Sequence, residues 1–304
     1  RINLIVGGSV QSLIHKIFES NKEPLYNRQT AIIRVNKFPP SVLKEILAYH
    51  NPNYTNDDLL ALYSFTGGVA KYVELLMDKG ATTRSKMIAT MVQADSIFLS
   101  EGKNLLIEEF GKDYGIYFSI LTAIASGHTQ RSQIEDMIGK EIGGYLTMLE
   151  DTYGIIHKHK PLFTIKNSNI HYRLNDNFLT FWFRFLFKYN HMLEIEAFEA
   201  LRQIIERDYE TFSGKMLEQY FKEKLAEQQQ FTRIDSWWSR NGESEIDVIA
   251  INEINKEAIF YEVKRQSKDI DLSLLEQRSK DFLVATRQLK RYANSHYGLS
   301  MQDM

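Results

Sequence analysis

The chain has 304 residues, a formal net charge of −2, 43% hydrophobic residues and 25% charged residues. Most single domains are shorter, so this length predicts two or three compact units. The absence of cysteine excludes disulfides, thiolate nucleophiles and cysteine-ligated zinc. No apolar run reaches the roughly 18 residues of a membrane span, and the opening residues are unlike a targeting segment. We therefore expect a cytoplasmic protein without a membrane partner.

The opening residues alternate between strand and helix patterns, as α/β domains do. Residues 2–6 predict a strand that ends in a Gly-Gly-Ser turn at Ser9, and apolar residues then recur at helical spacing. Residues 31–35 predict a second strand. Two strands do not close a sheet, so we expect the first 38 residues to be poorly packed or to depend on a neighbouring molecule.

A helical pattern follows from residue 41 to about residue 109, interrupted at Gly67-Gly68. Residues 113–192 then contain three short amphipathic stripes and two strand-like pieces, residues 155–159 and 171–174. Three helices and a hairpin predict a winged helix, which is a variant of the helix-turn-helix. An aromatic segment, residues 178–189, predicts a buried helix after it.

The winged-helix segment contains the one basic stretch of the sequence. Between residues 152 and 190, six cationic residues accompany a single acid, Asp176. Lys158, Lys160 and Arg173 are the candidate contacts to DNA phosphates. The alternative is a lever or protein-contact role, because the expected recognition helix is acidic. Three histidines on the same hairpin could bind a metal, but without acidic or cysteine partners they are more typical of a solvated surface; they are His157, His159 and His171.

The last ninety residues read helix, strand, strand, helix, strand. The apolar stripe of the first helix places Glu218 at its edge. Residues 245–251 and 258–264 predict two strands of a hairpin in which paired positions sum to 509. This register places Asp247 opposite Glu262. Lys264 then lies two residues further along the same strand face.

Two opposed carboxylates repel each other unless a cation lies between them. Glu218, Asp247 and Glu262 are therefore candidate ligands of Mg²⁺, which prefers oxygen donors. Such a cation would polarise a phosphodiester and activate a bound water, while Lys264 oriented that water or stabilised charge on the phosphate. The candidate catalytic residues are thus Asp247, Glu262 and Lys264. The alternative is an exposed strand-end aspartate and an ordinary surface pair of Glu262 with Lys264.

Several motifs occur together in one order along the chain. They are LIVGGS ending at Ser9, PLYNR ending at Arg28, TGGVAKY from Thr66, YRLNDNFL from Tyr172, FWFRF from Phe181, EID ending at Asp247 and YEVK ending at Lys264. In these motifs the chain resembles the archaeal-type ATPase family of the STAND/AAA-like class. That family carries a winged helix and a C-terminal PD-(D/E)XK nuclease-like domain of unknown function.

The resemblance implies that Ser9 ends a strand beside the ATP γ-phosphate and that Arg28 reaches the nucleotide or a neighbouring subunit. Their alternatives are a helix-capping serine and a surface salt-bridge arginine. Asn27 and Ala70 depart from the family, which usually has Gly and Pro there. The chain contains no G-x-x-x-x-G-K-[ST] phosphate-binding loop. We therefore expect no ATP hydrolysis by this chain alone and place the missing phosphate-binding part upstream.

The expected fold is multidomain α+β. Its parts are a C-terminal remnant of an ATPase α/β core (1–40), a helical lid (41–112), a winged helix (113–192), a linker helix (193–213) and a restriction-endonuclease-like α/β domain (214–304). The expected function is control by ATP of a Mg²⁺-dependent nuclease-like domain that acts on or binds DNA, with self-association through the ATPase part. The alternative is a non-enzymatic switch or docking protein that retains the nuclease fold.

Overall fold

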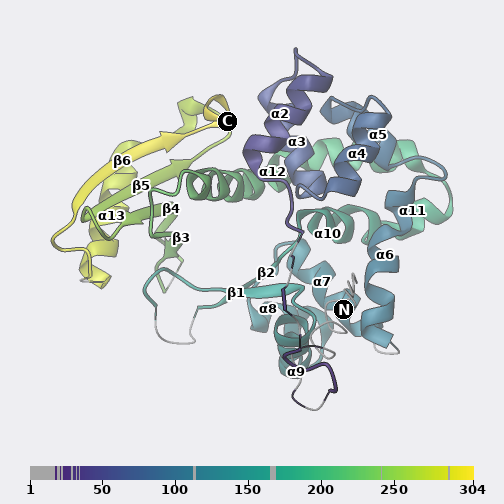
Figure 1. Cartoon of the computed structure of the whole chain (residues 1–304), viewed down its shortest axis with the longest axis horizontal. Coiled ribbons are helices and arrows are strands. Elements are labelled where there is room, and N and C mark those ends of the chain that lie inside the picture. The colour runs from purple at the N-terminus through teal and green to yellow at the C-terminus, as the bar shows by residue number, and fades with distance from the viewer. Residues whose placement is uncertain are drawn as a thin grey trace.

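The structure is a computed structural model that describes residues 18, 21, 23–28, 30, 31, 33, 35–111, 114–164, 169–240, 242–286 and 288–304. It is an α+β protein with a helical half and a sheet half (Figure 1). None of the described helices is both long enough and apolar enough to cross a membrane. Ser9 and the strand expected over residues 2–6 lie outside the described residues.

The strand expected over residues 31–35 is wrong at every described position. Ala31, Ile33 and Val35 belong to no strand, and the side chains of Ile33 and Val35 are 89% and 93% exposed. A strand is stable only when its backbone groups pair with a neighbour. Within the described residues, no strand pairs with this segment. Arg28 lies nearby in an exposed turn.

The helical half begins with the helices that the sequence pattern predicts. They are α2 (Pro40–His50), α3 (Asn56–Thr66), α4 (Ala70–Asp78), α5 (Arg84–Met91) and α6 (Ile97–Phe110). A capping box between Thr55 and Asp58 starts α3, and Gly67 in a left-handed conformation ends it. The next residue must also be glycine, because a Cβ on Gly68 would lie 2.2 Å from the carbonyl oxygen of Phe38.

The three short helices and the hairpin predicted over residues 113–192 are confirmed. They are α7 (Tyr114–Ala125), α8 (Arg131–Ile138), α9 (Gly143–Thr147), β1 (Ile156–His159) and β2 (His171–Leu174). Strands β1 and β2 pair antiparallel and form the wing. The predicted buried aromatic helix follows as α10 (Asn177–Phe181) and a π-helical turn over Trp182–Phe187. Trp182 packs so closely on α6 that a Cβ on Gly102 would lie 2.3 Å from its indole ring.

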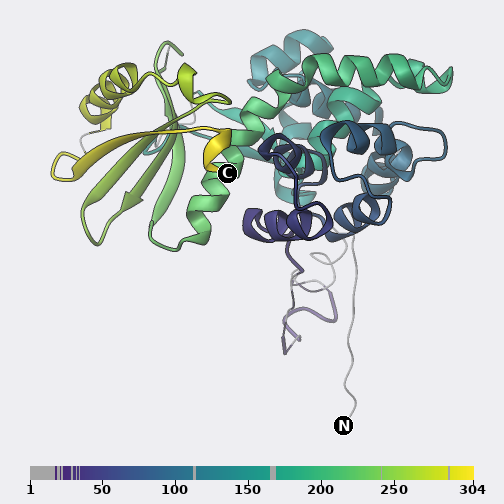
Figure 2. The same cartoon turned by 90° about the horizontal axis from the view of Figure 1, so that it is seen from above.

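A single long helix, α12 (Phe198–Glu227), joins the two halves after the short α11 (Asn190–Glu194) (Figure 2). It packs on α3 and α5 in the helical half and on β3 and β4 in the sheet half. The helix is continuous across positions 213 and 214, where we expected a linker to meet the last domain. Ion pairing reinforces the junction, because the Arg265 guanidinium lies 2.6 Å from the Asp57 carboxylate on α3.

The sheet half consists of β3 (Arg233–Trp238), β4 (Glu245–Asn252), β5 (Glu257–Val263), α13 (Leu272–Thr286) and β6 (Ala293–Leu299). The described strands lie in the order β3-β4-β5-β6; the first two pairings are antiparallel and the last is parallel. Helix α12 covers one face and α13 the other. The predicted hairpin register is confirmed from Val248↔Tyr261 to Asn252↔Glu257. Strand β3 is an addition to the pattern read from the sequence.

Candidate functional site

The acid pair lies at the end of β4 and β5 that is remote from their connecting turn. The Lys264 ammonium is 3.7 Å from Asp247 Oδ2 and 3.3 Å from Glu262 Oε1. The two carboxylate oxygens are therefore within about 7 Å of each other. The structure thus brings Asp247, Glu262 and Lys264 together, as the hairpin register predicts.

Each carboxylate is held by further groups. Glu262 is 3% exposed, and its Oε2 accepts a hydrogen bond of 2.7 Å from the backbone N–H of Asp271. The Arg278 guanidinium on α13 lies 3.8 Å from Glu262 Oε1. Asp247 Oδ2 accepts a 2.8 Å hydrogen bond from the backbone N–H of Val263. These contacts fix both carboxylates from the strand ends and from α13.

Glu218 reaches the same region from α12. Burial raises the pKa of Glu218 to about 7, and the negative charge of Asp247 contributes in the same direction. Within the described residues, the Glu218 side chain makes no hydrogen bond or ion pair. It is therefore a third, half-buried carboxyl group beside the acid pair, and it exchanges its proton near neutral pH.

The positive charge of Lys264 offsets the negative charges of the acid pair only in part. Burial raises the pKa of Asp247, although the Val263 N–H and the Lys264 charge oppose the shift. Burial alone would lower the pKa of Lys264, but the charges of Asp247 and Glu262 outweigh it and the pKa is raised. Lys264 is thus an ammonium group at neutral pH. It can stabilise negative charge on a phosphate, but it cannot act as a general base.

The carboxylates do not form a ready-made metal centre. In the described part of the chain, no three His, Cys, Asp or Glu side chains are grouped so as to hold a metal ion. The Lys264 ammonium contacts both Asp247 and Glu262, as a bridging cation would. The donor set is all oxygen and suits Mg²⁺. Binding would require Lys264 to withdraw and Glu218 to move closer.

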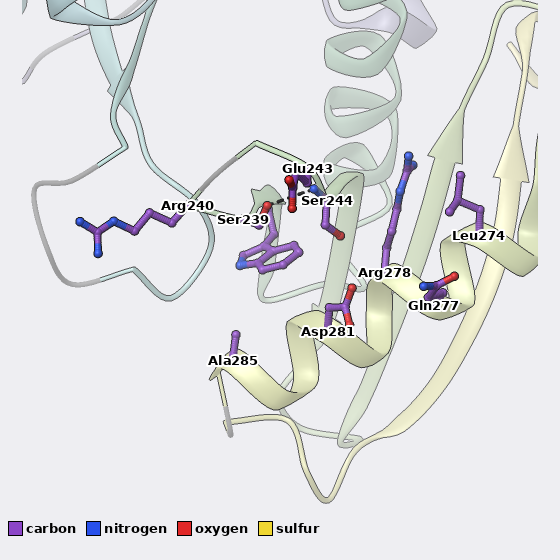
Figure 3. A pocket seen from close by; sticks show the side chains of 10 residues that line it. Ser239, Arg240, Glu243, Ser244, Leu274, Gln277, Arg278, Asp281 and Ala285 are labelled. Carbon is purple, nitrogen blue, oxygen red and sulfur yellow. Dashed lines mark hydrogen bonds between the residues drawn. The ribbon is translucent and has the colours of Figure 1, made fainter.

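A cavity of about 470 Å³ lies between α13 and the loop that joins β3 to β4 (Figure 3). Arg278 lines this cavity and also approaches Glu262. Arg240 on the loop adds a second cation, while Glu243 and Asp281 add two acids. The lining is therefore mixed in charge, and Arg278 connects it to the acid pair.

The wing packs against β3 through its histidine-bearing face. The Leu162 N–H donates a 3.0 Å hydrogen bond to the Ser236 carbonyl oxygen. The Trp238 ring lies 4.7 Å from the His159 ring and 5.1 Å from the His171 ring, measured between centroids. The expectation of solvated histidines is therefore wrong for His159, which is 7% exposed. Tertiary packing of the wing on β3 removes it from water.

His159 is neutral at pH 7. Burial lowers its pKa to about 4, despite a 2.9 Å contact between His159 Nε2 and Asp235 Oδ1. We read this contact as a hydrogen bond from a neutral ring rather than as a salt bridge. Protonation would add a donor at Nδ1, which is buried and lacks a partner among the described residues. The buried Lys222 ammonium, 3.9 Å from Asp235, already compensates that carboxylate.

The three candidate DNA contacts do not share one surface. In the wing, Lys158 pairs with Tyr172 and Arg173 with His157, so Lys158 and Arg173 point to opposite faces. Lys158 forms an ion pair with Glu150. Lys160 follows the end of β1 and is half-buried. The structure therefore separates these cations instead of aligning them along a duplex.

Sequence reasoning did not find Arg278, Lys222 or Asp235. These residues come from α13, α12 and β3, and only the folded arrangement brings them near the acid pair or the wing. One signal was available in the sequence. Lys222 lies four residues after Glu218, so both occupy one face of the same helix.

Two comparisons relate the chain to known proteins, and a third finds no match. Residues 182–282 match the family DUF234, described as Archaea bacterial proteins of unknown function. The chain is 30% identical over 280 residues to an uncharacterized protein of Methanocaldococcus jannaschii. That alignment covers 88% of this chain and 61% of the relative, so the chain spans less than two thirds of the relative's length. No solved structure matches the chain.

Proposed function

We propose that the sheet half is a Mg²⁺-dependent nuclease-like domain that hydrolyses phosphodiester bonds in DNA. One observation carries the proposal. Asp247 and Glu262, on neighbouring strands, both lie within 3.7 Å of the Lys264 ammonium. Glu218 adds a third carboxyl group whose pKa the Asp247 charge helps to raise. Acids with perturbed pKa values concentrated beside a cation are typical of functional sites.

In this proposal the side chains have separate roles. Asp247, Glu262 and, once ionised, Glu218 would hold the cation through their carboxylate oxygens. When bound, Mg²⁺ would supply Lewis acidity for the attack of water on the phosphodiester. Lys264, displaced from the carboxylates, would pair with a phosphate oxygen and stabilise the charge that develops there. Arg278 is placed to contact the next phosphate, because it lines the adjacent cavity.

The ATP-dependent part of the proposal rests on the sequence resemblance. In a longer polypeptide, ATP bound near Ser9 and Arg28 would act on the nuclease-like domain through the helical half and the wing. Contacts of α12 with both halves and of the wing with β3 provide two physical connections. DNA binding and self-association belong to the same proposal.

The test uses the whole chain. Isothermal titration with Mg²⁺ and Mn²⁺, together with cleavage of plasmid DNA, should show saturable binding and metal-dependent nicking. Asp247→Asn and Glu262→Gln should each abolish both. Glu253→Gln is the matched control, because this exposed carboxylate pairs with Arg233 in a neighbouring part of the sheet half. Equal activity in Asp247→Asn and the wild type would refute the proposal.

A second candidate is the non-enzymatic switch or docking protein. It is favoured by the ion pairs of Lys264, which partly compensate the charge of the acid pair without a metal. This reading predicts no heat of Mg²⁺ binding and an unchanged melting temperature in Mg²⁺ or Mn²⁺.

A further inference from the structure

A second cavity, of about 360 Å³, lies between the wing, the aromatic helix and α12. This volume is within the range of small-molecule sites. Cationic side chains from four segments line it, namely Lys37 before α2, Arg173 on β2, Arg184 in the π-helical turn and Lys215 on α12. Glu223 is the one acid among the lining residues. The cavity therefore concentrates positive charge, although the chain as a whole is slightly acidic.

Two of these cations lack partners. Within the described residues, Arg173 and Lys215 make no hydrogen bond or ion pair. Lys37 differs, because its ammonium donates a 2.8 Å hydrogen bond to the Asn175 carbonyl oxygen and lies 3.7 Å from the Asp176 carboxylate. Glu223 accepts a 3.0 Å hydrogen bond from the amide of Gln219. The cavity thus keeps a positive field that a bound anion would neutralise.

Two polar atoms of the lining residues also lack partners. Arg184 Nη1 donates a hydrogen bond of 3.3 Å to the Ala125 carbonyl oxygen. Its Nε is buried and has no hydrogen-bond partner among the described residues. Ser126 Oγ is likewise buried without a partner in the described chain. Buried donors without acceptors are uncommon in folded proteins. Both atoms are closed to solvent, so an anion in the cavity would reach them only after a movement of the cavity wall.

The remaining lining is mixed, and its apolar part includes Ile124, Phe212 and Met216. We propose that this cavity binds a small phosphorylated organic molecule. Its phosphate contacts Arg173 and Arg184, since guanidinium groups bind phosphate through paired hydrogen bonds. Its organic part packs on the apolar wall. Neither Asp247 nor Glu262 lines the cavity, so the site does not depend on the proposed hydrolysis.

The test is calorimetric titration of the whole chain with inorganic phosphate and with adenosine 5′-monophosphate. Both should bind saturably, and the nucleotide should bind more tightly because it also fills the apolar part. Arg173→Met should weaken both by about ten-fold or more, and Lys215→Met should weaken them less. Neither substitution removes a described contact, so the fold should be retained. The control is Lys86→Met, at an exposed position on α5 outside the cavity.

The outcomes separate the possibilities. Absence of saturable binding by both probes, or unchanged affinity in Arg173→Met, would overturn the site. If phosphate binds but the nucleotide binds no more tightly, the proposal that the ligand has an organic part would be wrong. Displacement of the nucleotide by a single-stranded oligonucleotide at matched phosphate concentration would assign the cations to a nucleic-acid backbone instead. Asp247→Asn should bind both probes like the wild type, which keeps this result distinct from the nuclease test.

Discussion

The acid pair and the cavity between the wing and α12, called the cationic cavity below, differ in how their charges are compensated. At the acid pair, Lys264 and Arg278 lie within 4 Å of carboxylate oxygens, so opposite charges are matched inside the protein. In the cavity, Arg173 and Lys215 have no partner within the described residues. A charge cluster whose members pair with opposite charges inside the protein contributes to stability. A cluster left unbalanced favours a ligand.

Removing the compensating cation should have the largest effect. Lys264→Met leaves Asp247 and Glu262 without their shared ammonium, and Glu262 is deeply buried. We expect a loss of about 2–3 kcal/mol in the free energy of unfolding, less than for a fully buried pair because Lys264 is partly solvated. Urea denaturation measures it. If the site binds metal, added Mg²⁺ should restore part of the loss. The exposed Lys268→Met serves as control, and equal stability of the two variants would contradict internal compensation.

Replacing Glu218 with a neutral side chain should raise the free energy of unfolding, whereas Lys264→Met lowers it. Its pKa in the folded protein is about 7, above the ordinary value of 4.5. The favourable contribution of its proton is complete below pH 4.5 and is lost as the pH rises through 7. At pH 8 without metal, Glu218→Gln should therefore raise the free energy of unfolding by about 1–2 kcal/mol. The gain should vanish near pH 5. A stability difference independent of pH would show that Glu218 is not strained by burial and by Asp247.

Acidification should weaken the packing of the wing on the sheet. The pKa of His159 is about 4 in the folded protein, below its ordinary 6.5. Its contribution to stability is complete above pH 6.5 and is lost as the pH falls toward 4. Between pH 7 and pH 5 the wild type should lose about 1–2 kcal/mol more than His159→Gln. Denaturation followed by tryptophan fluorescence reports it, since Trp238 contacts His159. Parallel curves for both proteins would contradict a buried neutral histidine.

The smallest effect is expected in the cationic cavity without ligand. Arg173→Met removes a charge that makes no hydrogen bond or ion pair in the described chain. It relieves repulsion among the lining cations but also removes the attraction between Arg173 and the Glu218 carboxylate. The free energy of unfolding should change by less than about 0.5 kcal/mol. Added phosphate should stabilise the wild type more than the variant at the same concentration. A large destabilisation by Arg173→Met would show that Arg173 has a structural role.

The sequence by itself determined the elements whose signals are local. Alternation and turn position established the β4–β5 register, because a shift of one residue would move every apolar side chain to the opposite face. That register placed Asp247 beside Glu262 before any tertiary information. The same local logic predicted three helices and a hairpin, which became α7, α8, α9, β1 and β2. It failed at residues 31–35, an apolar run with which no strand of the described residues pairs.

Only the tertiary structure decided how these elements meet. His159 and Asp235 are 76 residues apart in the chain, and no periodicity specifies that the wing packs on β3. The continuity of α12 across positions 213 and 214 places Lys215 in the cationic cavity and Glu218 beside Asp247. Neighbouring residues of one helix thus take part in opposite electrostatic environments. Periodicity reports which side of an element is buried; the partner that buries it is set by the packing of distant segments.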